Sequence, residues 1–303
     1  MNPVVSVVIA TRDRPEMVRE AIDSVYAQTL DGDIEVIVVA DQSEPDLGLV
    51  RHEDGRSTRV ISNTRRAGLA GARNTGIEAA TGDYVAFCDD DDLWLPGKLE
   101  RQVAALEAAP GAGLSTCGIR VEYGGETFSR SLDAEAVTFD DLLRDRHTEL
   151  HPSTFVMRRE VLLEQIGLVE EEVPGGFGED YEFLLRAARA HPVVNVREVL
   201  AVVRWGQQSF FFRRWETMAA GLTWLLDRYP EFGTSRKGSG RLMGQIAFAH
   251  AAMNRRRSAA AWVGRALMAN PTEPRVYLAL AVATSVLTPD TVMERLHRHG
   301  RGI

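Results

Sequence analysis

Four consecutive aspartates, Asp89 to Asp92, follow a strand-like apolar run and are the first group of side chains in this sequence that could do chemistry. Adjacent carboxylates repel one another, at a cost of about 1 kcal/mol for two charges roughly 4 Å apart in water and several-fold more where they are partly desolvated. A cation removes this cost, and Mg²⁺ and Mn²⁺ favour oxygen ligands together with water and substrate phosphates. The run therefore predicts a divalent-metal site that handles phosphates. The structural alternative is a solvated acidic turn.

Polar clusters also follow two earlier predicted strands. Val4 to Ala10 and Ile34 to Ala40 are continuous apolar runs, typical of strands buried on both faces. The first is followed by Thr11-Arg12-Asp13 and the second by Asp41. Because predicted helices alternate with the strands, we expect an α/β fold with a mixed, mostly parallel sheet flanked by helices. Ligands bind such sheets at the carboxyl ends of the strands, where these clusters converge.

The remaining predicted elements follow from apolar spacing and from glycine and proline positions. We expect strands at Tyr84 to Cys88 and Leu114 to Tyr123, and helices from Pro15, over Gly68 to Ile77, over Lys98 to Leu106 and over Arg159 to Gln165.

A second pair of acids, Glu179 and Asp180, follows the glycine-rich loop 174–178 at the start of a predicted helix. Such a loop is typical of a mobile segment at an active site. Acids at a helix N-terminus are also stabilised by the helix dipole, so a purely structural role is the alternative.

Length and composition predict a globular protein with one large α/β domain and a smaller appendage. The chain has 303 residues, of which 45% are hydrophobic and 26% charged.

Its two cysteines, Cys88 and Cys117, form no CxxC pair, so we expect a reducing, cytoplasmic location. The apolar start lacks a basic segment before it and predicts a strand rather than a signal peptide. The apolar stretch Val276 to Leu287 is too short to span a bilayer.

Charge divides the chain into two segments. Residues 1–212 hold 21 Lys+Arg against 37 Asp+Glu, a net charge of −16, whereas residues 213–303 hold 14 against 6, a net charge of +8. We therefore expect a site-bearing domain at 1–212 and a basic helical extension at 213–303 that acts as a cap, a homodimer interface, or a contact for an acceptor or a membrane. Arg255-Arg256-Arg257 would suit anionic lipid head groups at the inner membrane face, with a solvated arginine cluster as the alternative. The acidic domain argues against nucleic-acid binding.

Five motifs, in order and at compatible spacing, resemble the family-2 inverting glycosyltransferases of the nucleotide-diphospho-sugar (GT-A) fold. The resemblance covers roughly residues 3–210. Its motifs are Val5 to Pro15, Val38 to Ser43, Ala72 to Gly76, Gly82 to Asp92, and Gly178 to Asp180.

The resemblance implies roles for individual residues on the donor side. Ala10, Thr11, Arg12 and Asp41 match nucleotide-sugar binding positions for the base and ribose, although Ala40 and Gln42 depart from the usual Asp-Asp-Gly-Ser motif. The D-x-D motif falls on Asp89-Asp90-Asp91, with Asp91 as the Mn²⁺ or Mg²⁺ ligand and Asp89 or Asp90 near the ribose. Arg73 matches a residue that positions the donor phosphates, or alternatively forms a salt bridge with the acidic strand ends.

On the acceptor side, the resemblance implies that Asp180 is the catalytic base and that Glu179 contacts the acceptor. One departure concerns the metal. Relatives often carry a histidine in a late loop, but the corresponding segment 203–208 has none. Two alternatives follow: metal binding is weaker, or Arg204 and Gln207 contact the diphosphate instead. His151 is an alternative metal ligand or a structural histidine.

The predicted function is metal-dependent sugar transfer with inversion, from a nucleoside-diphosphate sugar to an acceptor hydroxyl. A UDP-sugar is the favoured donor by resemblance, and the acceptor is open: a glycan, a lipid carrier, a small natural product or a peptide. Two alternatives stay open. One is a catalytically silent sugar-nucleotide-binding scaffold, which the missing histidine favours. The other is a sugar-nucleotide pyrophosphorylase, which the absence of a glycine-rich loop around Thr11 to Pro15 disfavours.

Overall fold

The computed structural model describes residues 3–205 and 214–298. The packing of the chain divides it into two units. The first comprises residues 1–139, 147–171 and 183–204, and the second comprises residues 140–146, 172–182 and 205–303. This division differs from the boundary expected at residue 212, because two short segments from the middle of the sequence pack with the C-terminal helices.

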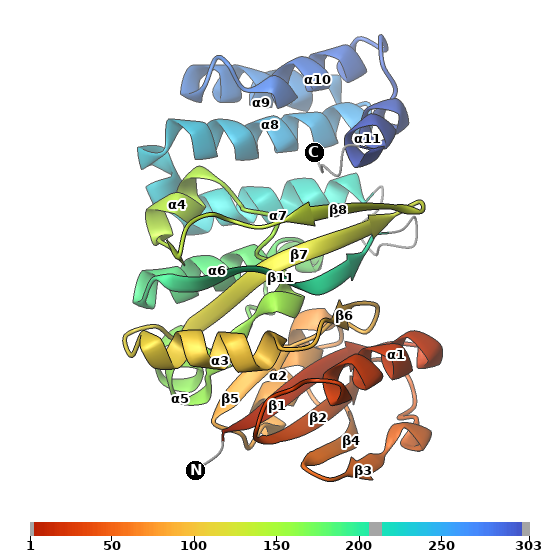
Figure 1. Ribbon diagram of the computed structural model, residues 1–303. Helices are drawn as coiled ribbons and strands as arrows, with labels where there is room; N and C mark the ends of the chain where they lie inside the picture. Colours follow the sequence, from red (N-terminus) through yellow and green to blue (C-terminus); the bar gives the residue numbers. More distant parts are fainter. Residues whose placement is uncertain (1–2, 206–213, 299–303) are drawn as a thin grey trace. The chain divides into compact units, whose positions relative to one another are not determined.

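The first unit is built on a mixed sheet, which has 11 strands within the described residues (Figure 1). β1, β2, β4 and β5 are parallel neighbours, whereas β10 runs antiparallel to both β5 and β7. The order is β3-β4-β2-β1-β5-β10-β7-β11-β6, with β8 pairing β7 and β9 pairing β11. The strands are β1 Val4–Thr11, β2 Asp33–Ala40, β3 Arg51–Glu53, β4 Arg56–Ser62, β5 Tyr84–Phe87, β6 Leu93–Trp94, β7 Leu114–Tyr123, β8 Glu126–Arg130, β9 Ala136–Val137, β10 Val156–Arg158 and β11 Val193–Arg204.

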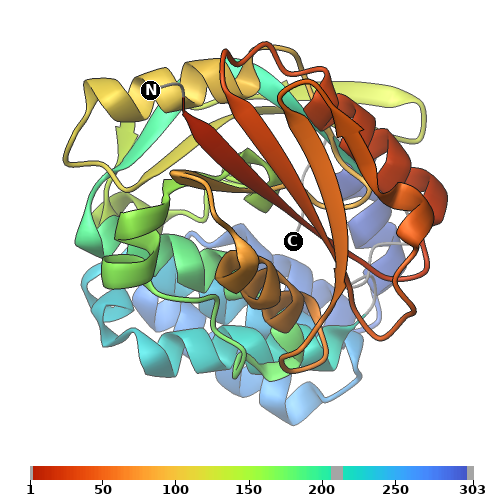
Figure 2. The same cartoon turned by 90° about the horizontal axis from the view of Figure 1, so that it is seen from below.

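Helices cover both faces of this sheet. α1 (Pro15–Tyr26) and α3 (Lys98–Ala108) lie on one face and α2 (Leu69–Ala79) on the other (Figure 2). Small residues of α2 allow it to approach the sheet closely: a Cβ on Gly76 would overlap the side chain of Val8. The predicted fold class is confirmed.

Two further helices begin where the sequence predicts them. The helix expected over Arg159 to Gln165 is a short α5 (Arg159–Val161) that runs into a π-helical turn, Leu162–Ile166. α6 (Glu179–Ala190) begins at the expected acid pair, and the division between the two units falls inside it, after Glu182.

The second unit is helical. α7 (Trp215–Arg228), α8 (Arg236–Ala252), α9 (Arg256–Ala269) and α10 (Pro274–Ala283) pack side by side, and α11 (Pro289–Arg298) follows them (Figure 1). Small residues such as Ala247 and Ala266 are buried between these helices together with Phe248. The unit also contains nearly all of α4 (Phe139–Arg144). Within the described residues, none of the helices has the length and apolar character needed to cross a membrane.

One buried lysine gives a prediction for stability. Lys98 of α3 is fully buried, and its Nζ lies 3.9 Å from the centre of the Trp94 ring without a hydrogen bond. Burial lowers the pKa of Lys98 to about 8, below the value of an unfolded chain. The folded protein therefore binds this proton less tightly than the unfolded chain does. Protonation of Lys98 thus lowers the free energy of unfolding, fully below about pH 8 and progressively less as the pH rises towards 10.5.

Lys98→Met is thus expected to raise the free energy of unfolding at pH 7 by about 1 to 3 kcal/mol, after the lost contact with Trp94 is deducted. Urea unfolding of both proteins at pH 7 and pH 10 measures this. The advantage of the variant should shrink at pH 10, and a variant less stable than the parent at pH 7 would contradict the prediction.

Candidate active site

The ends of β1 and β2 meet as the sequence predicts. The hydroxyl of Thr11 donates a hydrogen bond to Asp90 at 2.7 Å, and the amide of Asp41 donates to the carbonyl of Thr11 at 2.9 Å. The Asp41 carboxylate is buried and accepts hydrogen bonds from Asn63 Nδ2 at 2.8 Å and from the amide of Gly68 at 3.0 Å. Thr11, Asp41 and Asp90 are therefore one connected group.

The other two residues of the β1 end are less constrained. Ala10 pairs with Val39 in the sheet and is partly exposed. The side chain of Arg12 is 55% exposed and reaches Asp13 at 4.0 Å, so it is accessible to a ligand. A cavity of about 270 Å³ lies beside these residues, between the start of α1 and the loop after β2, with Thr11, Arg14, Ala40 and Ser43 in its lining.

Arg14 was missed as a site residue by the sequence analysis. Its guanidinium lies 3.0 Å from Asp90 Oδ1 and 2.9 Å from Asp91 Oδ2. Burial raises the pKa of both carboxyls, and mutual repulsion within the aspartate turn adds to the shift, whereas Arg14 opposes it. Arg14 thus supplies part of the positive charge that the turn needs.

Asp89 has a different cationic partner. Arg73 of α2 is 3% exposed and lies 2.6 Å from Asp89 Oδ1, above the Phe87 ring. The structure thus shows the salt bridge that was one of the two expected roles of Arg73. A contact of Arg73 with donor phosphates stays a prediction.

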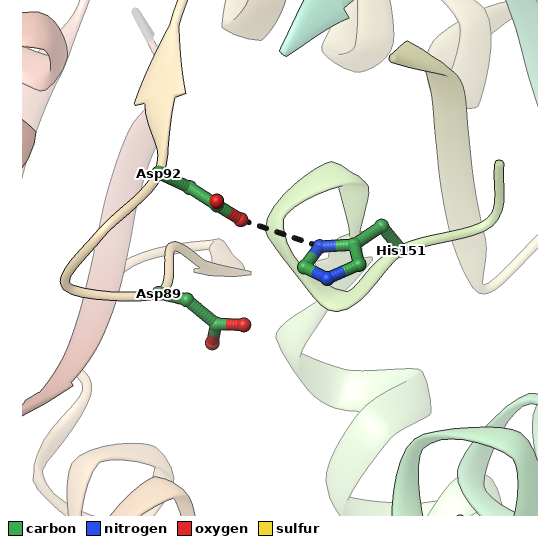
Figure 3. Close-up of side chains that lie close together, drawn as sticks. All are labelled: Asp89, Asp92 and His151. Carbon is green, nitrogen blue, oxygen red and sulfur yellow. Dashed lines mark ion pairs between the residues drawn. The ribbon is translucent and has the colours of Figure 1, made fainter. Parts of the chain in front are cut away.

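Among the described residues, three side chains with metal-ligating atoms lie together: Asp89, Asp92 and His151, whose ligand atoms are all within 4.8 Å of one another. Figure 3 shows His151 facing Asp92, with Asp89 beside them, and His151 Nδ1 lies 3.3 Å from Asp92 Oδ2. The burial of Asp92, together with repulsion from Asp89 and Asp91, raises the pKa of its carboxyl well above the usual value. The lone histidine of the sequence analysis therefore has two carboxylate neighbours.

Ser153 connects all three members of this group. Its hydroxyl donates to Asp92 Oδ2 at 2.5 Å and accepts from the amide of Asp89 at 3.0 Å, and its own amide donates to His151 Nδ1 at 3.4 Å. It is completely buried. Its position in the sequence, 61 residues after Asp92, carries no signal of this role.

Asp91, the expected metal ligand, is not in this group of three. Its carboxylate is 35% exposed and faces Arg14. Four carboxylates in the turn are matched by two guanidinium groups, Arg14 and Arg73, so the turn carries more negative than positive charge. A divalent cation with oxygen and nitrogen ligands fits this donor set and this charge.

Arg204, expected to contact the diphosphate, pairs with an acid in the structure, and its contact with a diphosphate stays a prediction. Its guanidinium lies 2.6 Å from Glu20 Oε2 on α1, and its backbone amide donates to Asp92 Oδ1 at 3.2 Å. The residue therefore supports the aspartate turn through its backbone. Gln207, the other expected contact, lies outside the described residues.

The acid pair Glu179-Asp180 lies in the second unit. Arg146 Nη2 is 2.5 Å from Asp180 Oδ2, and Asp180 Oδ1 accepts the amide of Tyr181 at 2.7 Å. The Asp180 side chain is 23% exposed, whereas Glu179 is buried at 4%. Asp180 thus has an accessible, oriented carboxylate, and Glu179 is largely shielded from solvent.

Comparison with known proteins identifies related sequences and folds. The family model for "Glycosyl transferase family 2" matches residues 6–165. The uncharacterized glycosyltransferase YwdF of Bacillus subtilis is 29% identical over 195 residues, which make up 63% of this chain and 70% of that protein. Across the first five curated relatives, the matched part spans between 62% and 76% of the relative's length.

Among solved structures, two examples resemble most of the chain. S. aureus TarS 1-349 has a TM-score of 0.60 at 18% identity and covers 92% of this chain and 87% of its own. The mannosyltransferase PcManGT of Pyrobaculum calidifontis, solved with GDP-Man and Mn²⁺, has a TM-score of 0.60 at 22% identity and covers 95% and 82%. At these identities the likeness establishes the GT-A fold.

Proposed function

Since this chain belongs to glycosyltransferase family 2, we propose that it is a metal-dependent inverting glycosyltransferase. It would move a sugar from a nucleoside-diphosphate sugar, with a UDP-sugar favoured, to an acceptor hydroxyl. The observation that carries this proposal is the connected acidic group at the strand ends, where Thr11, Asp41 and the aspartate turn meet. Family membership favours sugar transfer over the pyrophosphorylase alternative.

The donor would bind along the strand ends. Ala10, Thr11, Arg12 and Asp41 are proposed to contact the base and ribose, with Asp89 and Asp90 near the ribose. TarS in complex with UDP and PcManGT in complex with GDP-Man support a nucleotide ligand without deciding the base. The strand ends are where ligands bind open α/β sheets.

One divalent ion, Mn²⁺ or Mg²⁺, would bind at the aspartate turn. Asp89, Asp92 and His151, which lie close together, are proposed as its ligands. Asp91 is proposed as a further ligand once Arg14 turns away. When bound, the ion would act as a Lewis acid that offsets the charge on the leaving diphosphate. Arg14 and Arg73 would then neutralise the rest of the turn.

Asp180 would deprotonate the acceptor hydroxyl as it attacks the anomeric carbon from the face opposite the leaving diphosphate. This requires a carboxylate within hydrogen-bond reach of the nucleophile. Arg146 orients the Asp180 side chain at 2.5 Å. Glu179 is proposed as an acceptor contact. The acceptor stays open. For the C-terminal helices, contact of Arg255-Arg256-Arg257 with lipid head groups and pairing of two copies are alternative proposals.

The test is calorimetric titration of UDP, GDP, dTDP, CMP and ADP into the protein, each with and without Mn²⁺. Micromolar, Mn²⁺-dependent binding of one diphosphate would support the proposal and name the donor class. The matching donor sugars are then incubated with the protein, and release of the nucleoside diphosphate is followed. Binding without any turnover would favour the scaffold alternative, and no binding would overturn the proposal.

His151 gives a separate prediction. If His151 supplies the nitrogen ligand, His151→Gln should weaken Mn²⁺ binding by about 10- to 100-fold, a range typical of disturbed metal sites. Electron paramagnetic resonance of free Mn²⁺ measures the affinity directly. His147→Gln is the matched control, because His147 lies near Glu149 and not in the group of three. Unchanged Mn²⁺ affinity in His151→Gln would show that His151 is a structural residue.

A further inference from the structure

The segment that carries Glu179 and Asp180 packs with the C-terminal helices. Residues 172–182 and 140–146 belong to the same unit as residues 205–303. The sequence analysis separated this acid pair from the helices by placing a boundary at residue 212. The structure therefore raises the question of what the helices do for the acid pair.

α7 packs directly against the glycine-rich loop before the acids. The carbonyl oxygen of Phe177 lies so close to Gly221 that a Cβ on Gly221 would overlap it. In the same way, Thr217 of α7 fills the space beside Gly175. Leu225 lies next to Gly178, 3.2 Å from where a Cβ would be if this residue were alanine. The loop that looked mobile in the sequence is thus in contact with three consecutive turns of α7.

Buried hydrogen bonds fix the two residues that follow Asp180. Tyr229, at the end of α7, donates its hydroxyl to Glu182 at 2.8 Å, and both residues are buried. Arg241 of α8 donates to the hydroxyl of Tyr181 at 2.9 Å, and that hydroxyl donates to the carbonyl of Leu142 at 2.6 Å. A buried polar group that loses its partner costs about 1 to 3 kcal/mol, so these bonds resist displacement of the first turn of α6.

We propose that α7 and α8 position the catalytic base: they hold the segment 172–182 so that Asp180 keeps a fixed place and direction. This inference rests on the proposed function, because it assigns the helices a role toward the proposed base. It gives the C-terminal extension a part in the chemical step. Gly221, Tyr229 and Arg241 are positioning residues, since they act through Phe177, Glu182 and Tyr181.

The test compares two glycine-to-alanine variants of α7 and α9. Gly221→Ala places a methyl group against the carbonyl of Phe177, whereas Gly264→Ala, also in a helix of this unit, meets nothing within 4 Å. The first measurement is hydrogen–deuterium exchange in the segment 172–182. The second is turnover, followed as the release of UDP when water serves as the acceptor for the sugar of a UDP-sugar. Calorimetric binding of UDP with Mn²⁺ is the third measurement.

We expect Gly221→Ala to exchange faster in 172–182 and to lose at least tenfold in kcat, with the Kd for UDP unchanged. Gly264→Ala should behave as the parent protein in all three. Tyr229→Phe, which removes one hydroxyl without adding volume, keeps the test decisive if Gly221→Ala fails to fold, and it should reduce kcat in the same direction.

The outcomes separate this inference from the function on which it rests. If the parent turns over donor, Asp180→Asn does not, and both Gly221→Ala and Tyr229→Phe retain the parent's kcat, the inference is wrong and the proposed function stands. If the parent turns over no donor sugar at all, the proposed function falls and this inference falls with it.

Discussion

Asp180→Asn is expected to reduce sugar transfer by about 10²- to 10⁴-fold, the usual contribution of a general base, while the Kd for the nucleoside diphosphate stays unchanged. Asparagine has the shape of aspartate and can still accept the hydrogen bond from the amide of Tyr181. It cannot remove a proton from an acceptor hydroxyl. The loss should therefore appear in kcat and not in donor affinity.

A matched carboxylate makes this result specific. Asp145 also lies in the second unit, where it pairs with Lys237 at 3.5 Å. Asp145→Asn changes the net charge by the same amount and should leave transfer unchanged. Turnover is measured as UDP release, and binding by calorimetry with Mn²⁺. Full activity in Asp180→Asn would remove Asp180 as the base.

The sheet could be predicted from the sequence because its strands are continuous apolar runs. Val4 to Ala10 was expected as a strand, and β1 is Val4–Thr11; Leu114 to Tyr123 was expected, and β7 has those bounds. A strand buried on both faces needs no contribution from distant residues to be identified. A helix was expected over Arg159 to Gln165, and the chain is helical there, with its second part wound as a π-helical turn that apolar spacing does not predict.

The site was predictable only in part, because a sequence motif names residues without naming their partners. Thr11, Asp41 and Asp90 were expected together and lie together. Arg14 was overlooked, although it sits three residues after Thr11, because only the fold turns its side chain onto Asp90 and Asp91. Ser153 and His151 reach Asp92 from 59 or more residues away, and no local pattern records that approach.

The division into two units also depends on contacts between residues that are far apart in the sequence. Charge and helix content suggested a break at residue 212, yet residues 172–182 pack with the later helices. The reason lies in particular contacts, such as Tyr229 with Glu182 and Gly221 with Phe177. Each contact joins residues that are more than forty positions apart in the sequence. A single break in the sequence cannot place such residues in the same unit.

Removing divalent cations with EDTA is expected to weaken UDP binding by about 10²-fold or more. The turn holds four carboxylates against the guanidinium groups of Arg14 and Arg73, and a diphosphate brings further negative charge. At an effective dielectric constant near 20, two unit charges about 4 Å apart interact by about 4 kcal/mol. A free-energy change of about 1.4 kcal/mol corresponds to a tenfold change in Kd. Losing even part of the attraction between the cation and these negative charges therefore raises the Kd for UDP strongly.

Asp91→Ala distinguishes an ion that uses Asp91 from one held by Asp89, Asp92 and His151 alone. If Asp91 is a ligand, the variant should lose the Mn²⁺ dependence of UDP binding, because alanine offers the ion no oxygen ligand. Asp23→Ala is the matched control, since Asp23 pairs with Arg51, away from the turn. Retained Mn²⁺-dependent binding in Asp91→Ala, with loss in His151→Gln, would place the ion on the group of three. UDP binding that is equal with and without EDTA in the parent protein would mean that Arg14 and Arg73 neutralise the turn without a metal.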